Sequence, residues 1–402
     1  MAFSFLSLFM VFFFVSLNGF QLGFSSQFGN FITWEDIRVE NYFGRMRITD
    51  RDNSSRVIMV AKDGSGDSYT VQGAIDLIPD FNNQRVKIWI LPGIYRERVL
   101  VPKTKPYVSF IAYRNAETVI SWNTKASDRD INGNETGTFN TATVDIQSDY
   151  FSATGITFEN TVVSVPGGQG MQAVALKVAG DKAMFIRVNI LGSQDTLLDL
   201  SGSHYFYQCY IQGAVDFIFG SARSLYQDCI LHSTAGSVGA IAAHHRNSAD
   251  EDSGFSFVNC KVNGTGSVLL GRAWGKYSRA VYSYCDFDGI IAPTGWSDWG
   301  DSSRRSTVLF GEYQCRGSGA NLENRVPWAK TFSFEEARPF LDMTFIDGNE
   351  WLRLLFSHCC RHASINGRIL HIFSVHTASQ MPNNAYSKYV QTGKLVPLLS
   401  RL

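Results

Sequence analysis

The sequence predicts an all-β protein folded as a right-handed parallel β-helix, a solenoid with a short N-terminal capping helix. Many short runs rich in Val, Ile, Phe and Tyr follow one another from Val57 onward, and the chain holds 35 Gly, 30 Phe and 16 Tyr beside only 10 Pro. These runs recur at intervals of about twenty residues, which is typical of a solenoid whose coils each contribute strands to parallel sheets.

The composition narrows the classes of function to consider. Lys and Arg together number 36, as do Asp and Glu, so the chain of 402 residues has no overall field that would recruit nucleic acid or an anionic membrane. Hydrophobic residues make up 45% of the chain, which is enough for a large core. The seven cysteines and eight histidines follow no spacing typical of a metal site, so we expect none.

The N-terminus begins with an uncharged apolar run, MAFSFLSLFMVFFFVSL, that has the length of the hydrophobic part of a secretory signal peptide. We predict a cleaved signal peptide over residues 1–20, with a signal anchor as the alternative. Residues 21–55 are polar and irregular and are predicted to form an N-terminal arm. The triplets at Asn53, Asn134 and Asn263 are candidate glycosylation sites, and they are compatible with secretion.

The main β-helical domain is predicted to span residues 56–352. Near its start, the segment Thr70–Pro79 (TVQGAIDLIP) has apolar residues at helical spacing and is expected to cap the stack. From residue 353 to residue 402 the β pattern stops, and this stretch carries four of the eight histidines and the adjacent Cys359 and Cys360. We predict an atypical, poorly ordered tail there.

Two aspartates fall at the same position of consecutive repeats. The segments MFIRVNILGSQDTLL and YFYQCYIQGAVDFIF align with Ile190 over Ile211 and Asp195 over Asp216, a shift of 21 residues. If this shift is one coil, the carboxylates lie about 5 Å apart, the spacing of hydrogen-bonded strands. Like charges that close cannot both ionise freely, so one becomes a proton donor and the other a charged nucleophile. The alternative is that each Asp only caps a turn between coils.

Further polar and aromatic residues fit the same chemistry. Gln194 precedes Asp195, and Gln172 lies 22 residues before Gln194, again about one coil. Neutral amides stabilise a developing oxyanion without neutralising a nucleophile. Arg272 and Trp274, in LLGRAWGKYSR, offer a cation for a carboxylate and a flat face for a sugar. The alternative for this set is solvent-facing ladder glutamines, a surface ion pair and a packed Trp.

Nine segments between about Val57 and Trp351 carry a more specific signal. They are KDGSGDSYTVQGAID, LPGIYRERV, GTFNTATVDIQSDYFSATGITFENT, GMQAVALKV, GSQDTLL, VDFIFG, LGRAWGKYSR, PTGW and FGEYQCRGSGANLENRVPW. In this order they resemble the motif series of plant pectinesterases, also called pectin methylesterases. The chain is similar to the shorter type, in which no long inhibitor-like pro-region precedes the catalytic domain.

The resemblance implies a reaction and a role for each polar residue. Asp216 would attack the methyl-ester carbonyl of a galacturonate in pectin. Asp195 would protonate the departing methanol and then activate the water that cleaves the acyl-enzyme. Gln172 and Gln194 would line the oxyanion site, and Arg272 would hold Asp216 in its ionised form. No metal or organic cofactor is implied.

The resemblance also implies how substrate is held and where. Phe139, Trp274 and Trp296 would form aromatic walls of the sugar-binding cleft, with Gln172 and Arg272 also contacting substrate. The partner would be methyl-esterified homogalacturonan in the extracellular cell wall, and a proteinaceous pectinesterase inhibitor is a second candidate partner. We expect a monomer that binds neither nucleic acid nor, after signal cleavage, a membrane.

Three places depart from the common family pattern. Ala273 stands where Pro is usual. Ala214 and Val215 replace a small-polar and aliphatic pair. His244 and His245 replace an amide-containing stretch. The first two changes remove no ionisable group of the proposed reaction, so they bear on substrate preference more than on activity. We interpret His244 and His245 as structural residues.

The cysteines are odd in number, which leaves at least one unpaired within the chain. The family pattern implies a bridge between Cys229 and Cys260 on neighbouring coils. Cys209 lies close to the catalytic coil, and we interpret it as a small buried residue and not as a second nucleophile.

Three other functions remain as alternatives. A β-helical glycosidase also suits carboxylates about 5 Å apart, but the two glutamines favour ester hydrolysis because an oxyanion arises in acyl transfer. A pectate lyase would need a calcium-binding carboxylate cluster, which we do not find in the sequence. A catalytically inactive wall-binding relative is the third, and the complete set of polar residues argues against it.

Overall fold

The computed structural model describes residues 31–39, 56–113, 116–165 and 167–354, together with the two short strands β28 (Ser364–Ile365) and β29 (Arg368–Ile369). These two strands pair antiparallel and belong to a separate unit that starts at Leu355. The predicted signal peptide, Asn53 and most of the predicted tail lie outside the described residues. No helix in the described ranges is long and apolar enough to cross a membrane.

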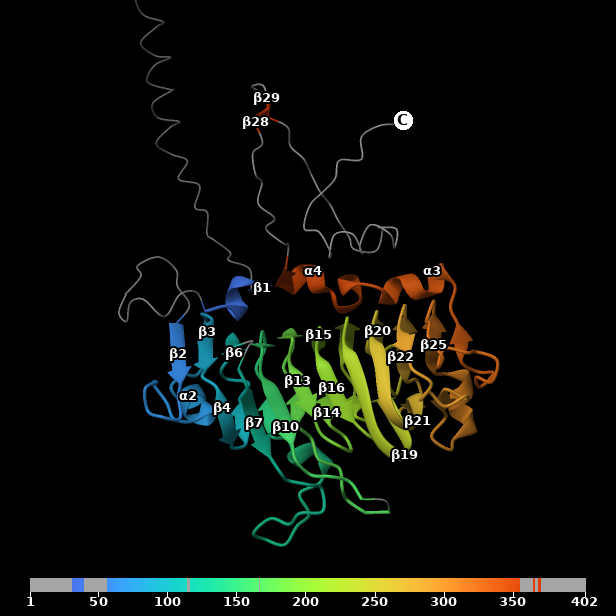
Figure 1. Cartoon of the computed structure of the whole chain (residues 1–402), viewed down its shortest axis with the longest axis horizontal. Coiled ribbons are helices and arrows are strands. Elements are labelled where there is room, and N and C mark those ends of the chain that lie inside the picture. The colour runs from blue at the N-terminus through green and yellow to red at the C-terminus, as the bar shows by residue number, and fades with distance from the viewer. Residues whose placement is uncertain are drawn as a thin grey trace, which may run out of the picture. The chain divides into compact units, whose positions relative to one another are not determined.

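The main unit is a right-handed parallel β-helix, which confirms the predicted fold class (Figure 1). One face is an 11-stranded parallel sheet in which strands from successive coils lie side by side. Its strands are β2 (Arg56–Val60), β3 (Val86–Ile90), β6 (Val108–Ala112), β9 (Ser152–Thr154), β12 (Ala183–Ile186), β15 (Ser203–Tyr207), β18 (Arg223–Gln227), β20 (Gly254–Val258), β22 (Arg279–Ser283), β25 (Leu309–Tyr313) and β26 (Lys330–Thr331).

The other faces belong to a 14-stranded parallel sheet that bends into two arms. The first arm contains β4 (Gly93–Arg96), β7 (Thr118–Trp122), β10 (Thr157–Asn160), β13 (Asn189–Leu191) and β16 (Tyr210–Gly213). The second arm contains β5 (Val99–Val101), β8 (Val144–Ile146), β11 (Leu176–Val178), β14 (Leu197–Asp199) and β17 (Ile218–Gly220). The long strands β19 (Ile230–His244) and β21 (Lys261–Ala273) run through both arms, and β23 (Asp286–Phe287) and β24 (Trp296–Ser297) complete them.

The register of the strands follows the repeat read from the sequence. Ile190 on β13 pairs with Ile211 on β16, and Leu191 pairs with Gln212. The predicted shift of 21 residues is therefore one coil. Since side chains alternate between the two faces of a strand, each coil repeats the same inward and outward positions.

Aromatic side chains stack on one another inside the solenoid. The ring centroids of Phe185 and Phe206 lie 4.8 Å apart, those of Phe206 and Tyr226 4.6 Å, and those of Tyr226 and Phe257 4.8 Å. Tyr282 continues the stack at 4.4 Å from Phe257. These spacings equal the distance between neighbouring strands, so the core is built from like residues at the same position of each coil.

A second interior ladder consists of cysteines. Five residues with left-handed backbone, Gln208, Asp228, Asn259, Tyr284 and Gln314, each immediately precede a cysteine. Cys229 and Cys260 are both free thiols, so the predicted bridge between them is wrong. Side chains stacked in register keep their Cβ atoms about one strand spacing apart, ~4.8 Å, which is farther than the ~3.5–4.5 Å that a disulfide favours. Cys209 is a buried free thiol, as expected.

A short helix lies where the sequence predicts one. Helix α2 (Val71–Asp76) begins at Thr70, whose hydroxyl accepts a hydrogen bond from the Gly73 N–H. Its apolar side packs against β2, β3 and β5 of the first coils, where Val71 and Ile75 are fully buried. That the helix caps the stack stays a prediction.

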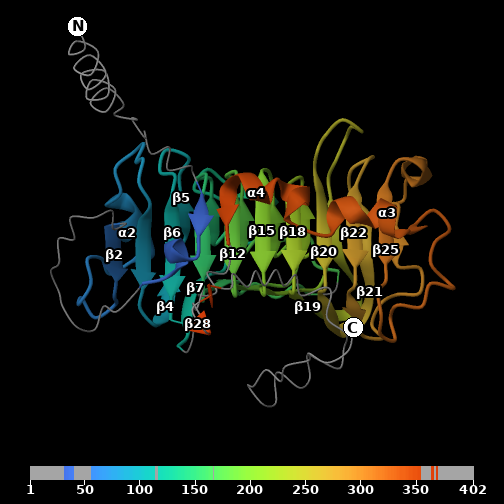
Figure 2. The same ribbon diagram turned by 90° about the horizontal axis from the view of Figure 1, so that it is seen from above.

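The outer face of the 11-stranded sheet is covered by the C-terminal part of the main unit (Figure 2). This part contains α3 (Phe334–Ala337), α4 (Gly348–Trp351) and the 3-10 turns η4 (Arg338–Phe340) and η5 (Met343–Ile346). Trp351 and Ile346 are fully buried there. Strand β1 (Ile32–Thr33) pairs with β27 (Leu352–Arg353), and η1 (Glu35–Ile37) contacts β6 and β9. The described part of the predicted N-terminal arm thus lies against the solenoid.

A buried ion pair connects β14 to β15. Asp199 Oδ1 lies 2.5 Å from His204 Nδ1, and Tyr226 OH donates to Asp199 Oδ2 at 2.6 Å. His204 Nε2 donates to Gly180 O at 2.8 Å. Since both ring nitrogens face acceptors, the imidazole is held as a cation. Burial alone would lower the pKa of His204, but the charge and hydrogen bond of Asp199 more than offset it, so this pKa is raised.

The cysteine ladder predicts that the fold needs no disulfide. We expect the thermal midpoint of the main unit to be the same with and without a reductant, because a core disulfide would contribute about 2–5 kcal/mol that reduction removes. We also expect alkylation after unfolding, without reductant, to label Cys209, Cys229, Cys260, Cys285 and Cys315 in peptide maps. A midpoint that falls on reduction would contradict this.

The His204 ion pair predicts a dependence of stability on pH. Because its folded pKa is raised, the stabilisation is complete below the ordinary His pKa of about 6.5 and is lost as the pH rises through the folded value. We therefore expect the difference in unfolding free energy between the wild type and His204→Gln to be largest in mild acid and to shrink as the pH rises. Urea unfolding at a series of pH values measures it, and a difference that grows with pH would exclude the ion pair.

Candidate active site

Two carboxylates sit at the bend between the two arms of the 14-stranded sheet. Asp195 lies between β13 and β14, and Asp216 lies between β16 and β17 one coil later. Gln194 and Val215 form a parallel bridge, and the Asp195 N–H donates to the Val215 carbonyl at 3.1 Å. The two aspartates therefore occupy the same position on neighbouring coils, with their backbones about 4.8 Å apart.

Both aspartates have an unusual backbone conformation. The φ angle is +61° at Asp195 and +45° at Asp216, in the left-handed region that most residues with a side chain avoid. Asp tolerates this region better than most residues, and strained conformations of this kind cluster at functional sites. Because the conformation is the same in both coils, the repeat presents the two carboxyl groups in the same direction.

Among the residues that the structure describes, a cation pairs with Asp216 and none pairs with Asp195. Arg272, on β21, donates from Nε to Asp216 Oδ1 at 2.7 Å and from Nη2 to Asp216 Oδ2. This two-pronged contact fixes the plane of the Asp216 carboxylate as well as its charge. On its other side the Arg272 guanidinium lies 4.0 Å from the ring centroid of Trp299.

The environment drives the two aspartates to different protonation states. Burial raises the pKa of Asp195 well above its ordinary value, and the nearby charge of Asp216 raises it further, against a smaller opposing effect of Arg272. Burial also raises the pKa of Asp216, but the hydrogen bonds and charge of Arg272 act in the opposite direction. On balance the pKa of Asp216 is raised less than that of Asp195, so Asp195 keeps its proton to a higher pH than Asp216 does.

Two glutamines lie on consecutive coils beside the aspartates. The Ala173 N–H donates to the Gln194 carbonyl at 3.0 Å, so Gln172 lies one coil before Gln194. The side chains of both glutamines are partly exposed, and neither amide group hydrogen-bonds to another residue in the described ranges. Their N–H donors are therefore available to a ligand.

Aromatic residues predicted for the cleft lie in two places. Phe139, in the 3-10 turn η2 (Thr138–Asn140), is 43% exposed. Its loop is tied to the glutamines because the Ala126 N–H donates to the Gln172 carbonyl at 2.9 Å. Trp274 follows β21 on the outer side of the second arm, with its ring 6.1 Å from that of Phe219. Both residues are accessible beside the polar groups.

Trp296 does not line the cleft, so that part of the prediction is wrong. Its side chain is only 2% exposed and stacks on Phe310, 4.7 Å away, inside the solenoid. Trp296 pairs with Gly271 on β21, and a Cβ atom at Gly271 would come within 3.0 Å of the indole. The indole therefore fills interior space that a glycine leaves open.

Trp299 is a site residue that the motif analysis missed. It is 37% exposed, and its ring lies over the guanidinium of Arg272. The signal was present in the letters WSDW, where a second Trp follows the inward one by three residues. Finding it required the pairing of Ser297 with Arg272, which brings the end of β24 beside the guanidinium.

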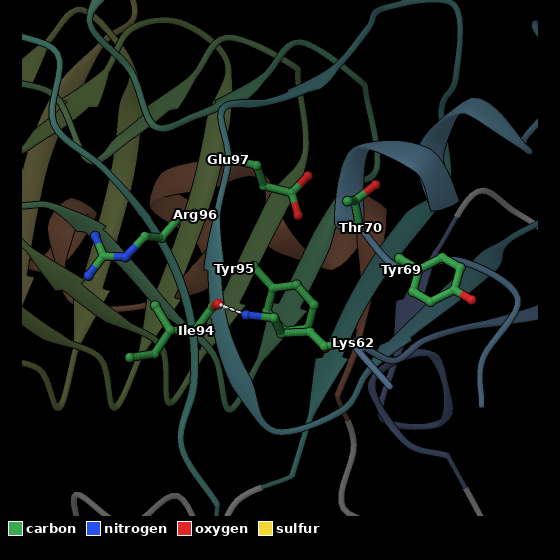
Figure 3. A pocket seen from close by; sticks show the side chains of 7 residues that line it. All are labelled: Lys62, Tyr69, Thr70, Ile94, Tyr95, Arg96 and Glu97. Atoms are coloured by element: carbon green, nitrogen blue, oxygen red, sulfur yellow. Dashed lines mark hydrogen bonds between the residues drawn. The ribbon is translucent and has the colours of Figure 1, made fainter. Parts of the chain in front are cut away.

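A cavity of about 350 Å³ lies apart from these residues, beside α2 and β4 (Figure 3). It is lined by Lys62, Tyr69, Thr70, Ile94, Tyr95, Arg96 and Glu97. The Glu97 carboxylate accepts hydrogen bonds from the N–H groups of Val71 and Gln72, and Lys62 Nζ donates to the Ile94 carbonyl. These two charged groups hold the first coil together, so we place the candidate site at the aspartates and not here.

Comparisons with known proteins agree on one family. Residues 57–349 match the family model described as Pectinesterase. The chain is 58% identical over 354 residues to "Pectinesterase QRT1" of Arabidopsis thaliana, covering 83% of this chain and 93% of that protein. The solved "Pectin methylesterase from Carrot" superposes with a TM-score of 0.68 at 35% identity, covering 73% and 94% of the two chains. A pectin methylesterase solved "in complex with hexasaccharide VII" gives 0.63 at 25% identity, covering 73% and 97%.

The site geometry predicts that Arg272 controls the ionisation of Asp216. Removing the guanidinium in Arg272→Ala should raise the Asp216 pKa, because burial would then act without an opposing charge. Arg272→Lys should raise it less, since a point charge remains but the two-pronged contact is lost. Titration of the labelled Asp216 carboxyl by carbon NMR measures the change. Arg305→Ala, which breaks an ion pair with Asp298, is the control, and an unchanged Asp216 pKa in Arg272→Ala would refute the assignment.

Proposed function

The chain belongs to the pectinesterase family and is a carboxylic-ester hydrolase that removes methyl esters from pectin, and on this premise we propose how its own residues divide the reaction. The observation that carries the assignment is the asymmetry of the carboxylate pair. Arg272 donates hydrogen bonds to both carboxylate oxygens of Asp216, whereas burial and the neighbouring negative charge of Asp216 keep Asp195 protonated. Asp216 is therefore the nucleophile and Asp195 the acid.

In the first half of the reaction, an Asp216 oxygen attacks the ester carbonyl carbon of a galacturonate. The carbonyl oxygen becomes an oxyanion, which the free amides of Gln172 and Gln194 stabilise. As the carbon–methoxy bond breaks, Asp195 gives its proton to the leaving oxygen, and methanol departs. The product is an anhydride between Asp216 and the galacturonate, with Asp195 now ionised.

In the second half, the ionised Asp195 removes a proton from a water molecule that attacks the same carbonyl carbon. The bond to Asp216 breaks, the new galacturonic acid group leaves and releases its proton to the solvent, and Asp195 is protonated again. Each cycle consumes one ester and one water and yields methanol and one acid group. Asp195 keeps intermediate exposure, which lets water and methanol reach it.

The two glutamines also separate this reaction from glycoside hydrolysis. A retaining glycosidase would use the same carboxylate spacing of about 5 Å. Its oxocarbenium-like transition state gains little from two neutral N–H donors, whereas an acyl transfer requires such donors. The free amide groups of Gln172 and Gln194 therefore support ester hydrolysis.

Substrate contacts and location complete the proposal. Phe139, Trp274 and Trp299 would hold the sugars of homogalacturonan, and the related pectin methylesterase solved with a hexasaccharide supports an extended polymer site.

We also propose that the chain acts as a secreted monomer in the cell wall after cleavage of its apolar N-terminal run, with a proteinaceous inhibitor as a further partner.

The two candidate glycosylation sites that the structure describes, Asn134 and Asn263, differ in their surroundings. Asn134 lies in an exposed loop, where an oligosaccharide transferase can reach it. Asn263 lies on β21, with its Oδ1 2.7 Å from His232 Nδ1. We therefore propose Asn134 as the better acceptor of the two.

The assignment predicts that Asp216→Asn, which keeps the shape but removes the nucleophile, lowers methanol release from highly esterified pectin by about 10⁴-fold or more while pectin binding persists. Asp195→Asn should cost about 10²–10⁴-fold, because it removes general acid–base catalysis only. Methanol and new reducing ends are followed together.

The control is Asp228→Asn, an aspartate with the same left-handed backbone at a different bend, between β18 and β19, which should keep full activity. Undiminished methanol release by Asp216→Asn would exclude this mechanism. Reducing ends without methanol in the wild type would favour the glycosidase alternative.

A further inference from the structure

Two adjacent histidines at the end of β19 point to opposite sides of the strand. His244 is fully buried, its ring lies 4.8 Å from that of Phe255 inside the solenoid, and its Nδ1 accepts from the Arg279 N–H. Burial and the charge of Arg279 lower the pKa of His244 to about 3, so it is neutral. The side chain of the next residue, His245, points to the opposite face of the strand and is partly exposed.

His245 belongs to the outer surface that carries the active site. Ala243 pairs with Arg272 on the neighbouring strand, and His244 pairs with Ala273, so His245 falls beside Trp274. The two rings lie 4.6 Å apart, which confirms this placement. The His245 N–H donates to the carbonyl of Gly220, which follows Asp216 by four residues. From strand spacing, the backbones of His245 and Asp216 therefore lie roughly 14 Å apart. That distance spans a few sugar units of an extended polymer whose reacting unit lies at Asp216.

The imidazole of His245 is free to bind a ligand. Its backbone is fixed, because its N–H donates to the Gly220 carbonyl at 2.8 Å. Within the described residues, neither ring nitrogen hydrogen-bonds to another protein group. The neighbouring cations are engaged: Arg272 holds Asp216, and Arg304 donates to the Trp274 carbonyl and pairs with Asp301. In either tautomer, His245 offers one N–H donor beside the flat face of Trp274.

We propose that His245 is a specificity-determining residue that binds the free carboxylate of a sugar a few units along the polymer from the one being de-esterified. This inference rests on the proposed function, in which the substrate is a polymer of galacturonate units. Each unit carries either a carboxylate, which is a strong acceptor with a full charge, or a methyl ester, which is a weaker neutral acceptor. An N–H donor at this distance from Asp216 therefore favours polymer that already carries acid groups.

The test compares two substrates with the same enzyme. Methanol release is measured on fully methyl-esterified homogalacturonan and on the same polymer after partial random alkaline de-esterification. We expect His245→Ala to lower kcat/KM about fivefold on the partly de-esterified polymer, through KM, which corresponds to one hydrogen bond of about 1 kcal/mol. The value on the fully esterified polymer should hardly change. His245→Gln, which keeps an N–H donor, should retain part of the preference.

His232→Ala is the matched control, because His232 lies on the same strand β19 in the other arm and pairs with Asn263 away from the aspartates. It should leave the ratio of the two kcat/KM values unchanged. Equal losses on both substrates in His245→Ala, or the same change of ratio in His232→Ala, would overturn the proposal. If the wild type released no methanol from either polymer, the proposed function itself would fail, which is a separate outcome.

Discussion

In-register stacking of the coils is the constraint on which this active site depends. Backbone hydrogen bonds between neighbouring strands fix which residue of one coil lies beside which residue of the next, and they do so without any contact between the catalytic side chains. The bridge between Gln194 and Val215 is the local instance of this constraint. A slip by one residue would place Val215 beside Asp195 and turn each side chain to the other face of its strand, so the pair exists only in this register.

The same stacking has opposite energetic effects inside the solenoid and at the bend. In the interior, placing like residues above one another is favourable, as in the stack of Phe185, Phe206 and Tyr226. At the bend it places Asp195 above Asp216, where like charges repel and burial weakens hydration. This unfavourable arrangement raises the pKa of Asp195, and Arg272 limits the effect at Asp216. The repeat that stabilises the core therefore also raises the pKa of Asp195, as a proton donor requires.

The sequence repeat predicted the features that recur in successive coils. It did not predict the features that depend on how one particular coil packs against its neighbour. The shift of 21 residues, and with it the pairing of Asp195 and Asp216, follows from the repeat alone. The expected exposure of Trp296 failed because the sequence does not show that Gly271, on the preceding coil, leaves interior space for an indole. The contact of Trp299 with Arg272 and the free state of Cys229 and Cys260 also depend on distances between neighbouring coils, which cannot be read from residue spacing along one strand.

The alternation of faces also decides which departures from the family pattern can alter substrate preference. Ala273, where Pro is usual, is fully buried among the interior residues, so its effect is on packing beneath the site. His244 is likewise interior and neutral. His245, one residue later, reaches the outer surface beside Trp274. Two neighbouring substitutions in one short segment thus have different consequences, because the period of a strand is two residues and the substrate meets only one of its faces.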